Sequence, residues 1–250
     1  MYRVDVINAV LASIQGRTYL EIGVDGGFSF KRVVAPRKIA VDPNSRYVQT
    51  MRWVTSFFPN GERYFAMTSD DFFENCNGVL KPGDLDLAFI DGLHTHIQST
   101  RDLLHCLEYL SPNGAIIMHD CNPTTEAMAY PAGSYEEAGR LGIIGWTGEW
   151  SGDVWKTIVE ARTNAALEVV VLDCDCGIGI IRRGLNRETL AYTADQTRAM
   201  SYSDLEAQRT TLLNLRPLEY LHTFLRQLKG ASSGAQSLGL KSLTTSIISA

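Results

Sequence analysis

Short apolar runs alternate with longer amphipathic segments along most of this chain, a pattern typical of a parallel sheet with crossover helices. Val4, Ile7, Val10 and Leu11 recur at helical spacing and predict a leading helix over residues 2–14. Compact β-rich runs then predict five parallel strands, at residues 17–22, 38–41, 63–67, 85–90 and 115–118. The alternation therefore predicts an α/β fold with a Rossmann-like, doubly wound sheet.

The segments between and after these strands predict the helices and the end of the sheet. Helices are expected at four places: from about Ser29, after a cap at Ser69, from about His96 to Leu110, and over Trp155–Ala161. Ser111–Gly114 is predicted to be a turn. Residues 167–172 and 177–181 predict two more strands, and the short link between them requires an antiparallel pair. The sheet is thus expected to be mostly parallel, with a C-terminal antiparallel hairpin and C-terminal helices after it.

The character of the chain changes after Arg183, and this change sets the expected domain boundaries. Residues 1–183 form the predicted α/β domain, with residues 124–155 as a long loop rich in aromatic residues and glycine that would act as a substrate lid. Residues 184–229 are expected to form a helical appendage, with an apolar helical side at 212–218 that suits a homo-oligomer contact. Residues 230–250 have the composition of a flexible tail.

Composition narrows the classes of function. The chain has 250 residues and a net charge of −5, so it lacks the basic excess with which a general nucleic-acid binder neutralises phosphates. No uninterrupted apolar stretch has transmembrane length, and five irregularly spaced cysteines suit a reducing compartment better than a disulfide framework. We therefore expect a cytoplasmic protein with a small-molecule partner, and neither a nucleic-acid nor a membrane partner.

A glycine-containing turn after the first strand predicts a nucleoside cofactor. Gly23 and Gly27 let the backbone approach a ligand closely, and Asp42, about 20 positions beyond the turn, is placed to accept hydrogen bonds from ribose hydroxyls. Glu21 precedes the first glycine, where its carboxylate can orient the loop and face the positively charged end of S-adenosylmethionine. A nicotinamide dinucleotide is the alternative, but its fuller Gly-x-Gly-x-x-Gly pattern is incomplete here, and Glu21 would lie poorly beside a pyrophosphate.

Four successive motifs resemble those of small-molecule class I S-adenosylmethionine-dependent methyltransferases. They are Glu21-Ile22-Gly23 with Gly27, Ala40-Val41-Asp42-Pro43, Phe89-Ile90-Asp91-Gly92-Leu93-His94 and Ile117-Met118-His119-Asp120. The resemblance covers about residues 15–185 and is nearest to bacterial enzymes related to sugar O-methyltransferases of antibiotic and polysaccharide pathways. It implies that S-adenosylmethionine is the cofactor, that Asp42 holds its ribose, and that Thr68, Ser69 and Asp70 lie near its adenine.

Titratable side chains cluster where two neighbouring strands are predicted to end. Asp91 and Asp120 follow these strands, and His94 and His119 lie beside them in sequence. Methyl transfer to oxygen needs a positioned acceptor and a group that takes the hydroxyl proton. We therefore expect these four residues to be catalytic, with His94 as the favoured base and His119 as the alternative. Asp91 is also expected to contact the cofactor.

A divalent metal is a competing account of the same cluster. In the sugar O-methyltransferases that the chain resembles, acidic residues at these two strand ends hold magnesium, which lowers the pKa of the acceptor hydroxyl. Asp91 and Asp120 match those positions, whereas His119 stands where an acidic ligand is expected. A single imidazole beside two carboxylates suits manganese or iron better than magnesium. A bound metal would thus be expected among Asp91, His119 and Asp120.

The predicted function is S-adenosylmethionine-dependent O-methylation of a sugar, nucleotide sugar or natural-product hydroxyl, with His/Asp base assistance, in natural product biosynthesis. Two alternatives stay open. An N-methyltransferase acting on a small amine would dispense with a strong base, and a non-catalytic nucleoside-binding domain would share the same fold. The four titratable residues at the strand ends favour an enzyme, because a binding module has no need of them.

Overall fold

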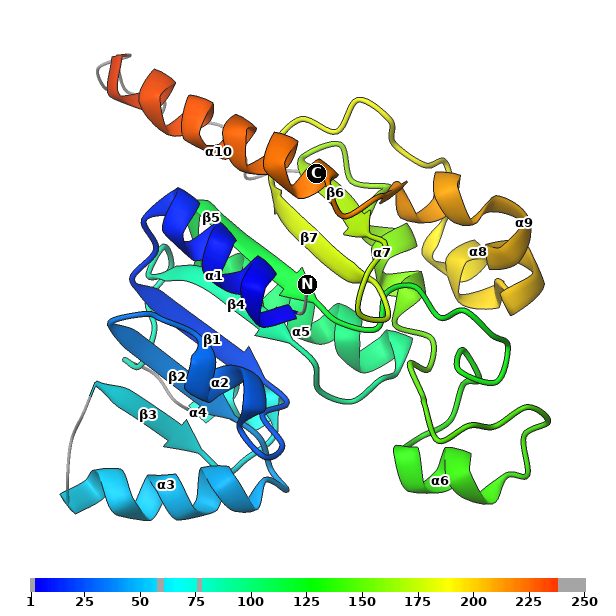
Figure 1. Cartoon of the computed structure of the whole chain (residues 1–250), viewed down its shortest axis with the longest axis horizontal. Helices are drawn as coiled ribbons and strands as arrows, with labels where there is room; N and C mark the ends of the chain where they lie inside the picture. The colour runs from blue at the N-terminus through cyan, green and yellow to red at the C-terminus, as the bar shows by residue number, and fades with distance from the viewer. Residues whose placement is uncertain (1–2, 58–60, 76–77, 238–250) are drawn as a thin grey trace.

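The structure is a computed structural model that describes residues 3–57, 61–75 and 78–237. Within these ranges the chain forms one sheet of eight strands in the order β3-β2-β1-β4-β5-β7-β6-β8 (Figure 1). The strands are β1 (Thr18–Ile22), β2 (Arg37–Val41), β3 (Glu62–Phe65), β4 (Leu85–Ile90), β5 (Leu110–Met118), β6 (Leu167–Leu172), β7 (Ile178–Arg183) and β8 (Leu215–Arg216). The first five are parallel, and β7 runs antiparallel to both β5 and β6, as predicted.

Helices cover both faces of this sheet. They are α1 (Arg3–Ile14), α2 (Phe28–Arg32), α3 (Arg46–Phe57), α4 (Ser69–Asn75), α5 (His96–Tyr109), α6 (Tyr135–Arg140), α7 (Trp155–Ala161), α8 (Ala194–Ala199), α9 (Tyr202–Leu213) and α10 (Tyr220–Ser237). The helices predicted after Ser69 and at His96–Leu110 and Trp155–Ala161 are confirmed, and the leading helix is α1. The patterns did not predict α3 or α6.

Alternation along the strands produces two hydrophobic cores. On β1, Leu20 and Ile22 point into the core that packs against α4, α5, α7 and α9. Tyr19 points to the opposite face, where α1, α2, α3 and α10 contribute the apolar side chains. Because successive strand residues face opposite sides, strand segments buried on both faces must be apolar throughout, as residues 87–90 of β4 and 115–118 of β5 are.

Two local predictions were wrong. Ser111–Gly114 is not a separate turn but lies within β5, where the pairing with β4 shifts register between Leu85 and Leu87. Ser69 is the first residue of α4 and not its cap: the Thr68 side chain accepts the Asp71 N–H instead. In both cases the residues are types that favour turns and caps. The sequence alone did not distinguish a turn from an irregular strand, or a cap from the first residue of a helix.

The C-terminal region packs onto the sheet more closely than its composition predicted. Leu212 and Leu213 end α9 in the hydrophobic core, and Leu215 lies in β8, which pairs with β6, so the predicted apolar helical side at 212–218 is wrong. α10 runs on to Ser237, so the tail predicted from 230 is helical over 230–237; residues 238–250 lie outside the described residues.

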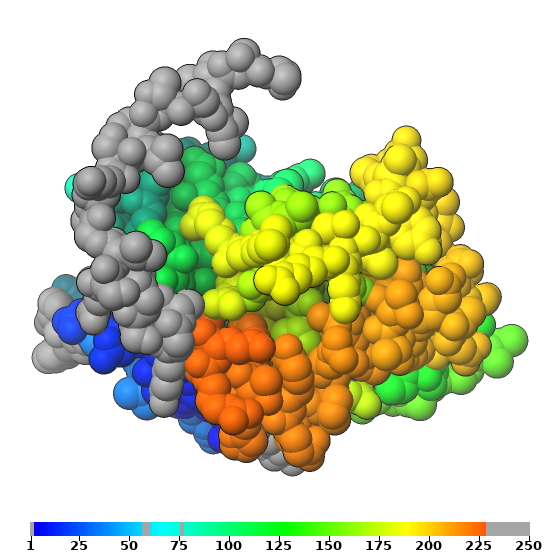
Figure 2. All heavy atoms as spheres, turned by 90° about the horizontal axis from the view of Figure 1, so that it is seen from above, coloured from blue at the N-terminus to red at the C-terminus, as the bar shows by residue number. Residues whose placement is uncertain are grey.

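α10 and α1 lie side by side across one face of the sheet. Figure 2 shows the C-terminal part of the described chain, in orange, against the first helix, in blue. The Ser13 hydroxyl of α1 donates a hydrogen bond to the Leu225 carbonyl of α10 at 3.1 Å. The two ends of the described chain therefore share one core. Among the described helices, none combines the length and apolar character needed to cross a bilayer.

The buried position of Leu213 has a measurable consequence. Leu213→Ala should lower the free energy of unfolding by about 2–5 kcal/mol, because it opens a cavity in a packed core. Urea denaturation checks this, with Ile144→Ala as the matched control, since Ile144 is 96% exposed. If Leu213→Ala lowered the free energy of unfolding no more than Ile144→Ala does, Leu213 would lie at the surface and not in the core.

Candidate functional site

Parallel pairing aligns the ends of four strands in one row. Ile22 of β1 pairs with Val41 of β2 and with Ile90 of β4, and Ile90 pairs with Met118 of β5. The residues that follow these strand ends therefore meet at one edge of the sheet. These residues are Gly23, Asp42, Asp91 and His119. The sheet thus brings the predicted cofactor loop and the predicted catalytic cluster together, at the carboxyl edge where such folds bind ligands.

Gly23 is the residue that allows this row to close. Its φ is +82°, and a Cβ built on it would lie 2.0 Å from the carbonyl oxygen of Asp91. Any other residue would push the ends of β1 and β4 apart. Gly27 also has positive φ, but a Cβ there would meet the Tyr47 ring, so Gly27 makes room for Tyr47 and not for a ligand.

A cavity of about 490 Å³ opens along this edge, a size that suits a small-molecule or cofactor site. Among the described residues that line it, five are aspartates and none is lysine or arginine. These aspartates are Asp25, Asp42, Asp70, Asp91 and Asp102. An acidic lining repels a pyrophosphate and favours a ligand with positive charge. S-adenosylmethionine carries a sulfonium and an ammonium group, so the cavity fits the predicted cofactor better than a nicotinamide dinucleotide.

Asp42 holds the two loops on either side of this cavity. One carboxylate oxygen accepts the N–H groups of Val24 and Asp25, at 2.8 and 2.9 Å. The other accepts those of Asn44 and Ser45, both at 2.8 Å. Asp42 lines the cavity, as its predicted ribose contact requires, and it also shapes the cofactor loop directly.

Glu21 does not line the cavity. It is 1% exposed and lies below the loop, where Oε2 accepts a 2.5 Å hydrogen bond from the Tyr19 hydroxyl. Burial raises its pKa to about 8, although the Tyr19 hydroxyl and Lys38 act in the opposite direction. The predicted role of Glu21 in orienting the loop fits this position, whereas the predicted contact with the amino-acid end of the cofactor does not.

Thr68, Ser69 and Asp70 line the cavity on the side of β3, next to α5. The Ser69 hydroxyl donates to Asp102 Oδ1 at 2.6 Å. Asp70 accepts from Arg101 at 2.6 Å through one oxygen and from Gln98 at 3.2 Å through the other. The turn predicted near the adenine is therefore part of the cavity. Gln98 and Asp102, which also line it, carry no motif and were missed.

His94 faces two carboxylates. Its Nδ1 lies 2.8 Å from the Trp150 carbonyl and must donate to it, which leaves Nε2 3.3 Å from Asp91 Oδ1 and 3.4 Å from Asp120 Oδ2. Burial lowers the pKa of His94, but Asp91, Asp120 and the Trp150 carbonyl outweigh burial and raise it to about 9. A ring with this pKa holds its second proton at neutral pH. The structure therefore argues against the prediction that His94 is a general base with a pKa near neutral.

The same three residues could hold a metal ion. Asp91, His94 and Asp120 each offer one ligand atom, and these atoms lie within 4.8 Å of one another. With Nδ1 donating to Trp150, a neutral His94 would direct the lone pair of Nε2 at both carboxylates, an arrangement that requires a cation between them. Two carboxylate oxygens and one imidazole fit manganese or iron. The structure thus favours His94 over His119 as the nitrogen ligand.

His119 is enclosed by carboxylates on both sides of its ring. Nδ1 lies 2.9 Å from Asp120 Oδ2, and Nε2 lies 3.4 Å from Asp175 Oδ1. Its side chain is 5% exposed, and the pKa of His119 is raised well above its usual value because Asp91 and Asp120 outweigh the effect of burial. His119 is therefore placed to neutralise its acidic neighbours and not to take a proton from a substrate.

Arg3 and Asp175 complete the cluster, and the sequence did not reveal either. Arg3 Nη1 donates to Asp91 Oδ2 at 2.7 Å, while its backbone N–H donates to Asp175 Oδ2 at 2.8 Å. Asp175 follows β6 and has a φ of +47°. It thereby caps the start of α1 and anchors it beside the strand ends. No local signal identifies such a pair, because 172 positions separate the two residues.

The lid segment borders the cluster at two points. A Cβ on Gly152, which has a φ of +56°, would lie 1.8 Å from the His94 carbonyl oxygen, so the chain passes directly over His94. The neighbouring Ser151 hydroxyl donates to Asp120 Oδ1 at 2.7 Å. Of the lid tryptophans, Trp155 is buried in the core, and Trp150 packs its ring against His94 at 5.4 Å.

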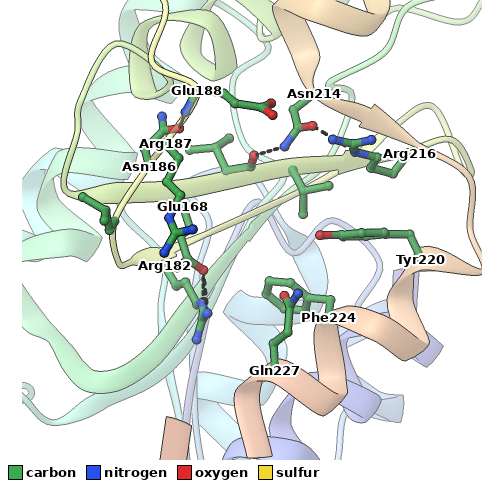
Figure 3. A pocket seen from close by; sticks show the side chains of 13 residues that line it. Glu168, Arg182, Asn186, Arg187, Glu188, Asn214, Arg216, Tyr220, Phe224 and Gln227 are labelled. Carbon is green, nitrogen blue, oxygen red and sulfur yellow. Dashed lines mark hydrogen bonds and ion pairs between the residues drawn. The ribbon is translucent and has the colours of Figure 1, made fainter. Parts of the chain in front are cut away.

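A second cavity of about 490 Å³ lies against β6, β8 and α10, away from the strand-end cluster. Figure 3 shows two pairs of polar side chains in this cavity that point toward each other, Glu168 with Arg182 and Asn214 with Arg216. Arg182 pairs with Glu168 at 2.5 Å, and Arg216 donates to Asn214 at 3.0 Å. None of the predicted site residues lines it.

Comparisons with known proteins cover the same region. Residues 20–121 match the model of a family described as a methyltransferase domain, a range that includes all four aligned strand ends. The SAH-bound methyltransferase PaMTH1 of Podospora anserina has a TM-score of 0.50 and 18% identity, over 74% of this chain and 80% of its own. A provisionally assigned caffeoyl-CoA O-methyltransferase from Staphylococcus aureus has the same score and identity, over 72% and 82%. No curated protein matches the chain.

The buried carboxyl of Glu21 should make stability depend on pH. Its pKa in the folded protein, about 8, lies above the usual 4.5, so folding favours the protonated form and stability falls as pH rises between these values. Between pH 6 and pH 8 this loss should reach about 2–3 kcal/mol. Urea unfolding of the wild type and of Glu21→Gln at both pH values measures it. If the wild type and Glu21→Gln lost the same free energy of unfolding between the two pH values, the loss would not come from the Glu21 carboxyl.

The anchoring of α1 by Arg3 can be tested separately. Arg3→Ala should lower the free energy of unfolding by about 1–3 kcal/mol, because it removes the guanidinium partner of two partly buried carboxylates, Asp91 and Asp175. Arg3→Lys should recover only part of this loss, since an ammonium cannot reach both carboxylates as a guanidinium does. Arg198→Ala, at a surface position 62% exposed, is the control. Full recovery by lysine would indicate that charge alone matters.

Proposed function

We propose that this chain, which is a class I S-adenosylmethionine-dependent methyltransferase, transfers the methyl group to a hydroxyl oxygen of a small molecule with the help of a divalent metal. The single observation that carries the proposal is the junction at Asp91. This residue lines the acidic cavity that fits the cofactor, and it is also one of the three residues that converge on a cation site. Donor and acceptor would meet at this point.

The reaction makes simple demands on the residues around it. The acceptor oxygen attacks the methyl carbon, the carbon–sulfur bond breaks, and the hydroxyl proton has to leave. A divalent cation bound by Asp91, His94 and Asp120 would lower the pKa of the acceptor hydroxyl and so remove the need for a strong base. Trp150 keeps the His94 ring in the required tautomer, and Ser151 holds the Asp120 carboxylate in place.

Several features support oxygen over nitrogen as the acceptor atom. A neutral amine needs no cation to lower its pKa, whereas this site gathers Asp91, His94 and Asp120 around one point. The same grouping favours an enzyme over a non-catalytic nucleoside-binding domain. A sugar, nucleotide sugar or natural-product hydroxyl is the acceptor class that we propose, in line with the sequence resemblance. The Staphylococcus aureus structural relative, provisionally assigned as an O-methyltransferase, is consistent with oxygen as the acceptor.

Metal removal is the direct test of this proposal. Methyl transfer to a panel of sugar nucleotides and hydroxylated aromatic compounds, followed by mass spectrometry, should disappear after treatment with EDTA and return with Mn²⁺. His94→Ala should lower the metal-dependent rate by about 100-fold or more, while S-adenosylhomocysteine binds within about threefold of the wild type.

Two outcomes would contradict the metal-assisted reaction. Undiminished activity in EDTA, with a rate that rises toward pH 9, would instead assign His94 as a general base. Tight binding of NAD with no binding of S-adenosylhomocysteine would remove the cofactor assignment altogether.

A further inference from the structure

One carboxylate oxygen of Asp102, a residue that lines the cofactor cavity, lies beside Gly92 of the same lining and accepts no hydrogen bond from the described residues. Asp102 is 1% exposed and lines the cavity from α5. Its Oδ1 accepts hydrogen bonds from the Ser69 hydroxyl at 2.6 Å and from Gln98 Nε2 at 3.0 Å. Within the described part of the chain, no donor contacts Oδ2. Leaving a buried carboxylate oxygen unpaired is unfavourable, so a ligand in the cavity that donates to Oδ2 gains affinity.

The position of Asp102 indicates which part of the cofactor it would meet. Ser69 opens α4, the helix that follows the edge strand β3, and its hydrogen bond to Oδ1 joins the Asp102 carboxylate to that side of the cavity. Asp91 follows β4, on the other side of β1 from β2 and β3, and belongs to the cluster with His94 and Asp120. With the methyl group at Asp91 and the ribose at Asp42, as the proposed function requires, the nucleobase reaches the end that holds Asp102.

The other acidic residue at this end is less suited to bind the base. Asp70 is engaged through both oxygens, by Arg101 on one and by Gln98 on the other. Its side chain is 31% exposed, so water competes for whatever lone pairs are left. Asp102 combines full burial with a free oxygen. Burial raises the pKa of Asp102 above its usual value, although the hydrogen bonds from Ser69 and Gln98 lower it.

We propose that Asp102 Oδ2 accepts a hydrogen bond from the 6-amino group of the cofactor adenine and that this contact selects adenine over hypoxanthine. Ser69 and Gln98 hold Oδ1, so the carboxylate does not turn away. A 6-oxo base would place a carbonyl oxygen against Oδ2, where two acceptors repel each other and neither finds a donor. This inference rests on the proposed function, because it requires an adenosine cofactor in the cavity.

Ligand binding to the intact protein tests this proposal without any turnover. Isothermal titration calorimetry would compare S-adenosylhomocysteine with two analogues: S-inosylhomocysteine, whose base is 6-oxo, and the purine analogue that lacks any 6-substituent. The wild type should bind both analogues about 10- to 100-fold more weakly, the cost of an unmade hydrogen bond to a buried charged group. Equal affinity for all three ligands in the wild type would overturn the proposal before any variant is made.

Variants then assign the preference to one residue. Asp102→Asn keeps the shape of the side chain, and in either orientation of its amide the preference for adenine over hypoxanthine should fall at least about fivefold, because the acceptor is either weakened or replaced by a donor. Asp195→Asn, the same change at a side chain that is 90% exposed, is the matched control, and its preference should stay as in the wild type. A preference that is unchanged in Asp102→Asn, or lost in Asp195→Asn, would refute the role of Asp102.

The outcomes also separate this inference from the proposed function. If the wild type binds S-adenosylhomocysteine but does not discriminate between the bases, only the assignment of Asp102 fails. If it does not bind S-adenosylhomocysteine at all, the cofactor assignment fails and the inference fails with it.

Discussion

The contact between the backbone of Gly23 and the carbonyl of Asp91 is the constraint on which the site depends. With 2.0 Å between that carbonyl oxygen and a Cβ built on Gly23, only glycine lets β1 and β4 end side by side. Their register then aligns Asp42 after β2 and His119 after β5 with the same edge. Asp42 extends the arrangement, because its four backbone hydrogen bonds tie the loops after β1 and β2 together. The first role of Gly23 is therefore to let the edge of the sheet form, and room for a ligand is a second consequence.

The strand-end cluster is organised by charge. Asp91, Asp120 and Asp175 come together with Arg3, His94 and His119, so each carboxylate has a cationic or potentially cationic partner. Bringing three carboxylates this close would be strongly unfavourable without such partners. Arg3 and His119 neutralise the inner side of the cluster, whereas His94 is the partner nearest the lid. A divalent cation in place of the second proton of His94 would lie between the same two carboxylates and would compensate more of their negative charge, which is why the site suits a metal as well as a proton.

The sequence predicted those features that depend on local periodicity. Strands such as 85–90 and 167–172 were found because each is a continuous apolar run, and Asp91 and Asp120 were found because they end such runs. Features that depend on distant packing were not found. The leucines at 212–213 look like an amphipathic helical side, and only the presence of β8 and β6 shows that they are core. Glu21 precedes the glycine turn as a ligand-binding residue would, yet side-chain alternation on β1 directs it away from the cavity.

Asp102 shows why the sequence predicted the location of the cofactor site but not all of the residues that line it. On α5 it lies four residues after Gln98, and in sequence the two resemble any polar positions on an amphipathic helix. Their role in the cavity becomes visible only in the structure, where Ser69, at the start of another helix, donates a hydrogen bond to Asp102. The two ends of the cavity then use carboxylates in different ways. At Asp91 the charge is compensated by neighbouring cations, so it positions other groups; at Asp102 one oxygen is left uncompensated, so it is available to a donor on the ligand. A cavity lined by one residue type can therefore distinguish the two ends of an asymmetric cofactor, because the partners of each carboxylate differ.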